Sequence, residues 1–195
     1  MRPGARAPKA LRLSFPERIA SHPVVLRTFL PADASRVVEL CGDWEVAGMT
    51  ALIPHPYLPG MAEYFIAACR EADAAGEPRT FAITRAGDGL LVGAIGLAAP
   101  SHDGDSFGYW VGRPYWGNGY ATAAARAVIA LAFSRLGLDA LHAVHLARNP
   151  ASGRVLAKCG MAEVGREMRP HRGGPPEEFR VWSIGRETWE RATQA

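Results

Sequence analysis

Two kinds of apolar periodicity alternate along the chain and predict an ordered series of strands and helices. Apolar residues that recur every third or fourth position indicate helices, and short β-rich runs indicate strands. We expect helices at residues 31–41, 44–49, 61–75, 120–136, 149–159 and 185–195, and strands at 24–29, 80–85, 90–98, 106–111, 141–147 and 179–184.

The clearest signals in this pattern are one hairpin and one long helix. Asp88-Gly89 stands between two apolar runs, which is typical of a tight hairpin turn. The order of elements is a strand, helices, a three-strand meander, and then alternating helices and strands. This order does not fit a regular doubly wound sheet, so it predicts a mixed α/β (α+β) fold. The longest helical stripe comprises Ala125, Val128, Ile129, Ala132, Phe133 and Leu136, with Gly137 as its end.

Length and composition are typical of one globular domain. The chain has 195 residues, of which 48% are hydrophobic and 21% are charged. We expect a flexible lead-in over residues 1–22 and a single domain over residues 23–195. The lead-in has no apolar core of the kind a signal peptide needs, and no apolar run approaches the length of a membrane span. We therefore expect a cytoplasmic protein with no membrane partner.

The cysteines and histidines give no sign of a metal site or a disulfide framework. Cys41, Cys69 and Cys159 are an odd number and form no C-x-x-C pair, so we expect reduced, packed thiols. His142 and His145 are three positions apart on a predicted strand and therefore face opposite sides of it. We expect no bound metal.

Positive charge is concentrated in one part of the chain. The whole sequence has a net charge of +3, which is too small to indicate a nucleic-acid partner. Residues 106–161 nevertheless hold six basic residues and one acid (6 − 1 = +5), whereas the remainder holds 16 basic and 18 acidic residues (−2). We expect this stretch to bind a polyanion. Its basic residues are Arg113, Arg126, Arg135, Arg148, Arg154 and Lys158.

A glycine-rich turn inside this basic stretch immediately precedes the long helix. Backbone N–H groups at a helix N-terminus favour an anion, and glycines allow its oxygens to approach closely. The turn lacks the Gly-Lys-Ser/Thr of a phosphate-binding P-loop. It also lacks the third glycine and the acid about 20 residues on that mark a dinucleotide fingerprint. A plain tight turn is the remaining alternative to an anion site. The sequence of the turn is Trp116-Gly117-Asn118-Gly119-Tyr120-Ala121.

Four short motifs stand out: residues 54–57, residues 107–111 before the turn, residues 115–122 at the turn, and residues 149–161 after the next predicted strand. Together they resemble the GCN5-related N-acetyltransferase (GNAT) superfamily, in particular its ribosomal-protein N-acetyltransferase-like (RimJ/RimL-type) branch. In that resemblance they are similar to the loop on the substrate side, the strand before the cofactor turn, the turn itself and the second cofactor motif. The resemblance covers residues 24–184 and implies a splayed, mixed central sheet flanked by helices.

The resemblance also implies acetyl-CoA as the cosubstrate and places it on named residues. The pyrophosphate would bind the turn, on Trp116, Gly117, Asn118, Gly119, Tyr120 and Ala121. The pantetheine arm would follow Trp110, Val111 and Gly112, where a backbone N–H could hold the thioester oxygen. Asn149 would also contact the arm. Asn149 can also be interpreted as an ordinary helix N-cap before Pro150. The cap role and the contact with the arm are compatible.

Catalytic roles are harder to assign from the resemblance. Many relatives place a tyrosine where this chain has Leu156, which removes that proton donor. Ser152 is then the candidate that protonates the leaving thiolate, by a hydrogen bond or through water, with an incidental helix serine as the alternative. His171 is the candidate general base, because imidazole titrates near neutral pH. Asp105, Glu45 and His55 are rival bases.

The predicted function is transfer of an acetyl group from acetyl-CoA to a primary amine, by direct attack in a ternary complex. Residues 52–60 and 167–178 would form the acceptor mouth. The acceptor is a protein N-terminus or a small-molecule amine, and the resemblance also allows a homodimer. Alternatives are another acyl donor or a non-catalytic acyl-CoA-binding or regulatory domain. A nicotinamide oxidoreductase is disfavoured by the missing acid.

Overall fold

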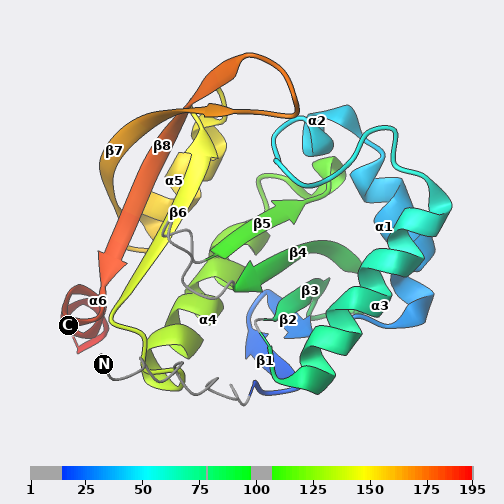
Figure 1. Cartoon of the computed structure of the whole chain (residues 1–195). Coiled ribbons are helices and arrows are strands. Elements are labelled where there is room, and N and C mark those ends of the chain that lie inside the picture. Colours follow the sequence, from blue (N-terminus) through cyan, green and yellow to red (C-terminus); the bar gives the residue numbers. More distant parts are fainter. Residues whose placement is uncertain (1–14, 78, 98–106, 195) are drawn as a thin grey trace, which may run out of the picture.

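Two antiparallel sheets lie side by side in the computed structural model, which describes residues 15–77, 79–97 and 107–194 (Figure 1). The first sheet has five strands in the order β1-β2-β3-β4-β5. The second has three, in the order β6-β8-β7. Their bounds are β1 Arg18–Ser21, β2 Val24–Arg27, β3 Thr80–Arg85, β4 Leu91–Leu97, β5 Phe107–Val111, β6 Ala140–Leu146, β7 Ala162–Pro170 and β8 Pro176–Gly185.

The sheets meet at β5 and β6, which diverge instead of forming a ladder. Each of these strands is the edge of its own sheet. A bulge in the β3–β4 register leaves Val92 between the pairs Ile83–Gly93 and Thr84–Leu91. Bulges bend a sheet and increase its twist, so this one contributes to the divergence. The splayed sheet implied by the sequence is confirmed.

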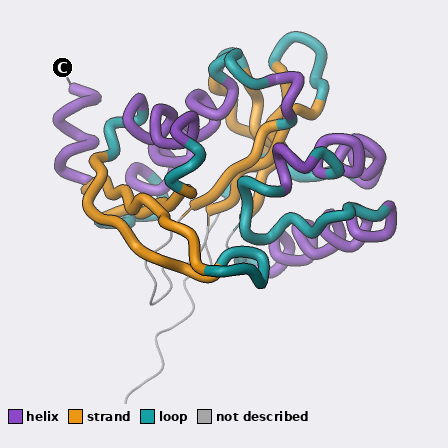
Figure 2. Tube along the Cα trace, turned by 90° about the horizontal axis from the view of Figure 1, so that it is seen from above, coloured by secondary structure: helices purple, strands orange, loops and turns teal. Residues whose placement is uncertain are grey.

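Helices cover both faces of the first sheet (Figure 2). Successive side chains along a strand point to opposite faces of the sheet. Phe81 and Ile83 pack in the core that includes α4, whereas Ala82 packs in the core that includes α1 and α3. The helices are α1 Ala34–Cys41, α2 Trp44–Ala47, α3 Pro59–Ala75, α4 Tyr120–Ser134, α5 Pro150–Lys158 and α6 Arg186–Gln194, with 3-10 turns at Pro31–Asp33 and Arg113–Tyr115.

One continuous core joins the two sheets beneath their line of divergence. Leu141 of β6 and Ile184 of β8 belong to the same buried cluster as Phe81 and Ile83 of β3. Leu156 of α5 is 1% exposed and completes it. The two halves are therefore one packed body, although their strands do not pair. No helix in the described part of the chain is long and apolar enough to cross a membrane.

The sequence analysis did not predict two of the strands, β1 and β7. β1 lies within residues 1–22, which were expected to be a flexible lead-in, so Arg18–Ser21 correct that boundary; residues 1–14 lie outside the described ones. β1 has only four residues and gives a short signal. β7 is an edge strand with every residue exposed or half-buried, so it carries no apolar alternation. Charged, solvent-facing edges of this kind are common in sheets.

The three thiols are free and buried, as predicted. Burial raises the pKa of Cys41 to about 12 and those of Cys69 and Cys159 to about 11. These thiols therefore stay protonated at neutral pH and are structural groups.

Gly93 allows β5 to approach β4 closely at the line of divergence. A Cβ on Gly93 would lie 2.2 Å from the carbonyl oxygen of Trp110 and 3.0 Å from the Cα of Val111. Both contacts are with backbone, which cannot move aside without displacing β5. The position of the edge strand therefore depends on this glycine.

We predict that Gly93→Ala lowers the free energy of unfolding by about 1–3 kcal/mol, because the added methyl overpacks a backbone contact. Gly108→Ala is the matched control, since a Cβ at Gly108 in β5 would have nothing within 4 Å. Urea denaturation measures both variants. Equal stability of the two would contradict the prediction.

Candidate active site

The glycine-rich turn has a backbone that only glycine adopts easily. Gly117 and Gly119 have φ angles of +80° and +77°, in the left-handed region. A Cβ at either position would meet nothing within 4 Å, so the turn faces open space. The two glycines are therefore required by the conformation of the turn and not by crowding.

Unpaired backbone donors point outward from the turn. α4 begins at Tyr120 with Gly119 as its N-cap, and no side chain caps it. The N–H of Ala123 donates to the carbonyl of Gly119 over 3.0 Å. The N–H groups of the three preceding helical residues, 120–122, therefore have no intrahelical acceptor. No acid occupies this first turn, so the site favours an anion.

Two side chains stabilise the turn, Asn118 from within it and Trp116 by a bond to β5. The amide of Asn118 donates to the carbonyls of Tyr115 and Trp116, each over 3.1 Å. The indole N–H of Trp116 donates to the carbonyl of Val111 over 2.6 Å. Asn118 and Trp116 were predicted to contact the cofactor. Their polar side-chain groups are already hydrogen-bonded within the protein, so a ligand would contact mainly their backbone.

The free edge of β5 also presents backbone groups, but fewer than predicted. The N–H of Gly112 donates to the carbonyl of Val92 over 2.9 Å. Hydrogen-bonded and non-bonded pairs alternate along an antiparallel ladder, so Trp110 also directs its groups to β4. Val111 and Tyr109 direct theirs to the gap before β6. Of the predicted Trp110, Val111 and Gly112, only Val111 keeps an N–H on the open side.

Ser152 lies across this gap, in the first turn of α5. Asn149 caps the helix, because its side-chain oxygen accepts the N–H of Ser152 over 3.2 Å. This contact is the N-cap role that the sequence allowed for Asn149. The Ser152 hydroxyl lies 2.8 Å from the phenol oxygen of Tyr109 on β5. A hydrogen bond thus links the two diverging halves at the predicted catalytic serine.

Tyr109 is the residue that the sequence reasoning missed. Its partner Ser152 lies 43 residues away in the sequence, so no local pattern indicates its role. Burial raises the pKa of the Tyr109 phenol. The phenol therefore stays neutral and acts as a hydrogen-bonding partner of Ser152. Leu156, where relatives have a tyrosine, is buried in the core, and its aliphatic side chain has no proton to donate.

His171 is a buried residue between the β7–β8 hairpin and α2, and not a solvated loop histidine. Its Nε2 lies 3.2 Å from the carbonyl of Gly48. A carbonyl only accepts, so Nε2 carries the proton and Nδ1 keeps a lone pair. Nδ1 is buried and has no partner among the described residues. The imidazole also packs edge-on against Phe179, with ring centroids 5.8 Å apart.

The carbonyl of Gly48 connects His171 to the cofactor motif. It accepts a second hydrogen bond from Nη2 of Arg148 over 2.8 Å. Arg148 directly precedes Asn149 and pairs with Glu177 of β8 over 2.6 Å. The Arg148 guanidinium lowers the pKa of Glu177 and keeps that carboxylate ionised. His171, the end of α2 and the start of the second motif therefore meet at one point.

The rival bases are less well placed. Glu45 pairs with Arg113 over 3.7 Å, and both side chains are more than half exposed. The His55 ring packs against Trp44 with a centroid distance of 5.1 Å. Asp105 lies outside the described residues. The described part of the chain holds no group of three His, Cys, Asp or Glu side chains that could bind a metal ion.

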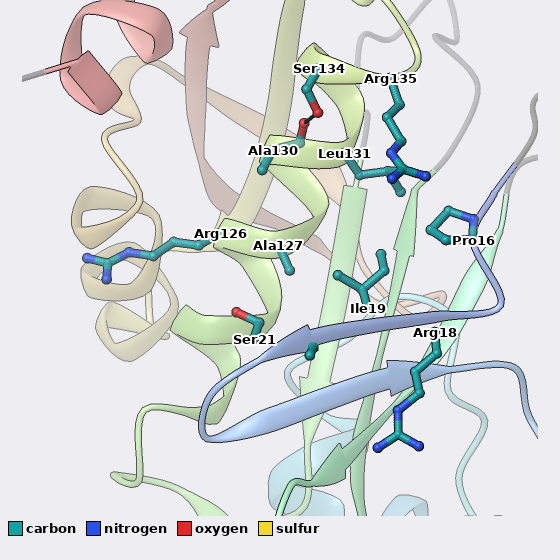
Figure 3. Close-up of a pocket in the computed structure, with 11 residues that line it drawn as sticks. Pro16, Arg18, Ile19, Ser21, Arg126, Ala127, Ala130, Leu131, Ser134 and Arg135 are labelled. Carbon is teal, nitrogen blue, oxygen red and sulfur yellow. Dashed lines mark hydrogen bonds between the residues drawn. The ribbon is translucent and has the colours of Figure 1, made fainter.

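A separate hollow lies between β1 and α4 (Figure 3). It has a volume of about 500 Å³. Its floor is aliphatic, with Ile19, Ala127 and Leu131, and the side chains of Arg126 and Arg18 extend away from each other at its rim. None of the predicted site residues lines it. It is distinct from the glycine-rich turn at the other end of α4.

Known proteins match this chain in sequence and in structure. A family model described as "Acetyltransferase (GNAT) domain" matches residues 24–162. The "FsC-acetyl coenzyme A-N(2)-transacetylase" of Aspergillus fumigatus is 37% identical over 92 residues, which are 46% of this chain and 39% of that protein. This chain thus spans well under two thirds of that relative.

The fold matches solved structures over nearly their full length. An acetyltransferase (GNAT family) from Bacillus anthracis has a TM-score of 0.77 at 23% identity, covering 87% of this chain and 99% of that one. A putative ribosomal-protein-serine acetyltransferase from Vibrio cholerae has a TM-score of 0.69 at 25% identity, covering 86% and 97%.

The raised pKa of Tyr109 gives a prediction about pH. We expect Tyr109→Phe and the native protein to show the same phenolate absorbance up to about pH 11, because the missing phenol does not ionise there. Spectrophotometric titration of folded protein, checked by circular dichroism, measures this. A deficit of one titrating phenol in the variant between about pH 9 and pH 11 would contradict the prediction.

Proposed function

The chain belongs to the acetyltransferase (GNAT) family, whose members take their acetyl group from acetyl-CoA, and we propose that it transfers this group to the primary amine of an acceptor. The reaction is a direct attack of the neutral amine on the thioester in a ternary complex. The observation that carries the proposal is the gap between β5 and β6. Its edge holds a free backbone donor, and its mouth adjoins a turn of outward N–H groups.

The glycine-rich turn supports binding of the CoA pyrophosphate. The N–H groups of Tyr120, Ala121 and Thr122 have no intrahelical acceptor, and the helix dipole favours an anion at this end. Gly117 and Gly119 leave the approach open. Further along α4, Nη2 of Arg126 donates to the backbone carbonyl of Lys158 on α5 over 2.8 Å. Arg126 thus adds positive charge where α4 meets α5.

The edge of β5 supports the chemistry of the thioester. In the proposed mechanism the N–H of Val111 donates to the acetyl carbonyl oxygen and stabilises it as the amine adds. The new C–N bond forms and the C–S bond then breaks. Holding both reactants in line in this gap supplies up to about 7–11 kcal/mol of the barrier reduction.

Two side chains would move the protons. His171 is the base that would take the amine proton through water; its Nε2–H is held by Gly48, and its Nδ1 lone pair, which is buried in this structure, must become accessible to water for that transfer. The Ser152 hydroxyl donates a hydrogen bond to the departing thiolate, which takes its proton through water, and that proton is balanced by the one the amine has released to His171. Tyr109 orients that hydroxyl over 2.8 Å. Asn149 holds the helix turn that carries Ser152.

The glycine-rich turn yields a prediction about cosubstrate affinity. We expect Gly119→Ala to weaken acetyl-CoA binding by on the order of 10-fold, because an L-residue at this φ is strained by about 1–2 kcal/mol and the N–H groups then diverge. Gly89→Ala is the matched control. Gly89 has a φ of +72° and equally open surroundings, but it lies in the β3–β4 turn. Calorimetry that finds equal affinities for the two variants would contradict the prediction.

The function itself is tested by mass spectrometry. The full chain is incubated with acetyl-CoA and a mixture of peptide N-termini, amino acids, polyamines and aminoglycosides. We expect one class of amine to gain an acetyl group. We also expect Ser152→Ala and His171→Gln each to lower kcat by about 10²-fold, since each removes a proton-transfer group.

Ser134→Ala is the matched serine control, because that hydroxyl bonds only the carbonyl of Ala130 within α4 among the described residues. Its kcat should equal that of the wild type. Acetyl-CoA binding without transfer to any amine would contradict the proposed enzyme and favour the non-catalytic acyl-CoA-binding domain.

A further inference from the structure

Arg172 has a backbone conformation that its side chain disfavours. It is the only non-glycine residue with a positive φ, +52°, in the part of the chain that the structure describes. It stands in the β7–β8 connection, beside Gly173, which also has a positive φ. Such strain persists where the surroundings fix it, and it often marks a functional position.

The surroundings that fix Arg172 belong to the other half of the molecule. Its Nη1 donates to the carbonyls of Ala47 (3.2 Å), Thr50 (3.5 Å) and Ile53 (2.5 Å). Its guanidinium carbon lies 5.2 Å from the ring centre of Trp44, a half-exposed indole at the start of α2. Figure 1 shows the β7–β8 connection reaching α2 across the gap between the sheets. The guanidinium is thus pinned through one nitrogen and one face.

The opposite edge of the same guanidinium is free. Neither Nε nor Nη2 of Arg172 donates a hydrogen bond to a described residue, and neither of these two nitrogens is buried. Both therefore reach solvent. Together Nε–H and Nη2–H form the parallel pair of donors that matches the two oxygens of a carboxylate.

In two other arginines the guanidinium forms an ion pair with an acid. Arg148 offers Nε (2.6 Å) and Nη2 (3.3 Å) to the two oxygens of Glu177. Arg113 lies 3.7 Å from Glu45. Arg172 forms no ion pair with any described acid, so its charge is uncompensated at this entrance.

A series of contacts connects Arg172 to the proposed reaction centre. His171, the adjacent residue, shares the carbonyl of Gly48 with Arg148, and Arg148 adjoins Asn149. The carbonyls that hold Arg172 belong to residues 47–53, the segment that leads into the predicted acceptor mouth. An acceptor that reaches the gap from this side passes the guanidinium.

We propose that the free Nε/Nη2 edge of Arg172 binds a carboxylate on the acceptor, so that the preferred acceptors are amines that also carry a carboxylate, such as amino acids or short peptides. This inference rests on the proposed function. Polyamines are disfavoured, because a second ammonium group would approach an uncompensated guanidinium. Arg172 is a specificity residue in this account and takes no part in proton transfer.

Matched amine pairs test the inference. Acetyl transfer is measured for β-alanine against propylamine, leucine against isopentylamine, and glycylglycine against glycylglycinamide. We expect the carboxylate member to have a kcat/KM on the order of 10-fold higher or more, mostly through KM, since charged hydrogen bonds are the strong ones. Arg172→Gly, which suits the positive φ, should bring the ratio to about one. Arg172→Lys should give an intermediate ratio, because it keeps the charge and loses the paired donors.

Gly173→Ala is the control for disturbance of the turn. It strains a residue with a φ of +72° and open surroundings, without touching the guanidinium, so the preference should survive. The acetyl-CoA affinity of Arg172→Gly, measured by calorimetry, should equal that of the wild type. Transfer without a carboxylate preference, or a preference that persists in Arg172→Gly, would overturn this inference alone. Binding of acetyl-CoA without transfer to any amine would overturn the proposed function and this inference with it.

Discussion

An unpaired strand edge inside the molecule is the constraint on which the site depends. Strands normally satisfy every backbone N–H and C=O, and a buried group without a partner costs roughly 1–3 kcal/mol. Here β5 and β6 lie next to each other and share a core, yet they belong to separate sheets. The groups of Val111 on the gap side therefore lack a strand partner, and the indole of Trp116 satisfies only the carbonyl. A ligand that accepts a hydrogen bond from the N–H of Val111 would satisfy the donor that the fold leaves unpaired.

A close backbone contact sets the position of the β5 edge, and side-chain hydrogen bonds join the two sides of the gap. Gly93 lets β5 lie close to β4, so the edge is set by backbone contact. Tyr109 reaches across to Ser152, and the cations Arg148 and Arg172, together with the imidazole of His171, reach from the second half to carbonyls at the end of α2. Cations near the C-terminus of a helix are favourable there. The proposed chemistry thus lies between two sets of cross-gap hydrogen bonds, one at the thiolate side and one at the acceptor side.

Sequence reasoning predicted the parts of the fold that have strong local signals. The strand at Thr80–Arg85 and the helix at Tyr120–Ser134 follow from apolar periodicity, and the glycine-rich turn follows from residues that tolerate positive φ. The exposed strand β7 and the four-residue β1 carry no such signal. The roles of Tyr109 and Arg172 could not be predicted, because each depends on a partner far away in sequence. For the same reason, only the register of β4 and β5 shows that the N–H of Val111 faces the gap whereas those of Trp110 and Gly112 face β4.

The most direct test is a crystal structure of the chain with acetyl-CoA. In the proposed mechanism the acetyl carbonyl oxygen lies about 2.7–3.1 Å from the backbone nitrogen of Val111, the range expected for an oxyanion donor. The pyrophosphate should lie on the N–H groups that precede Ala123. A thioester bound away from the β5 edge, or a Val111 N–H that donates to another strand in the complex, would contradict it.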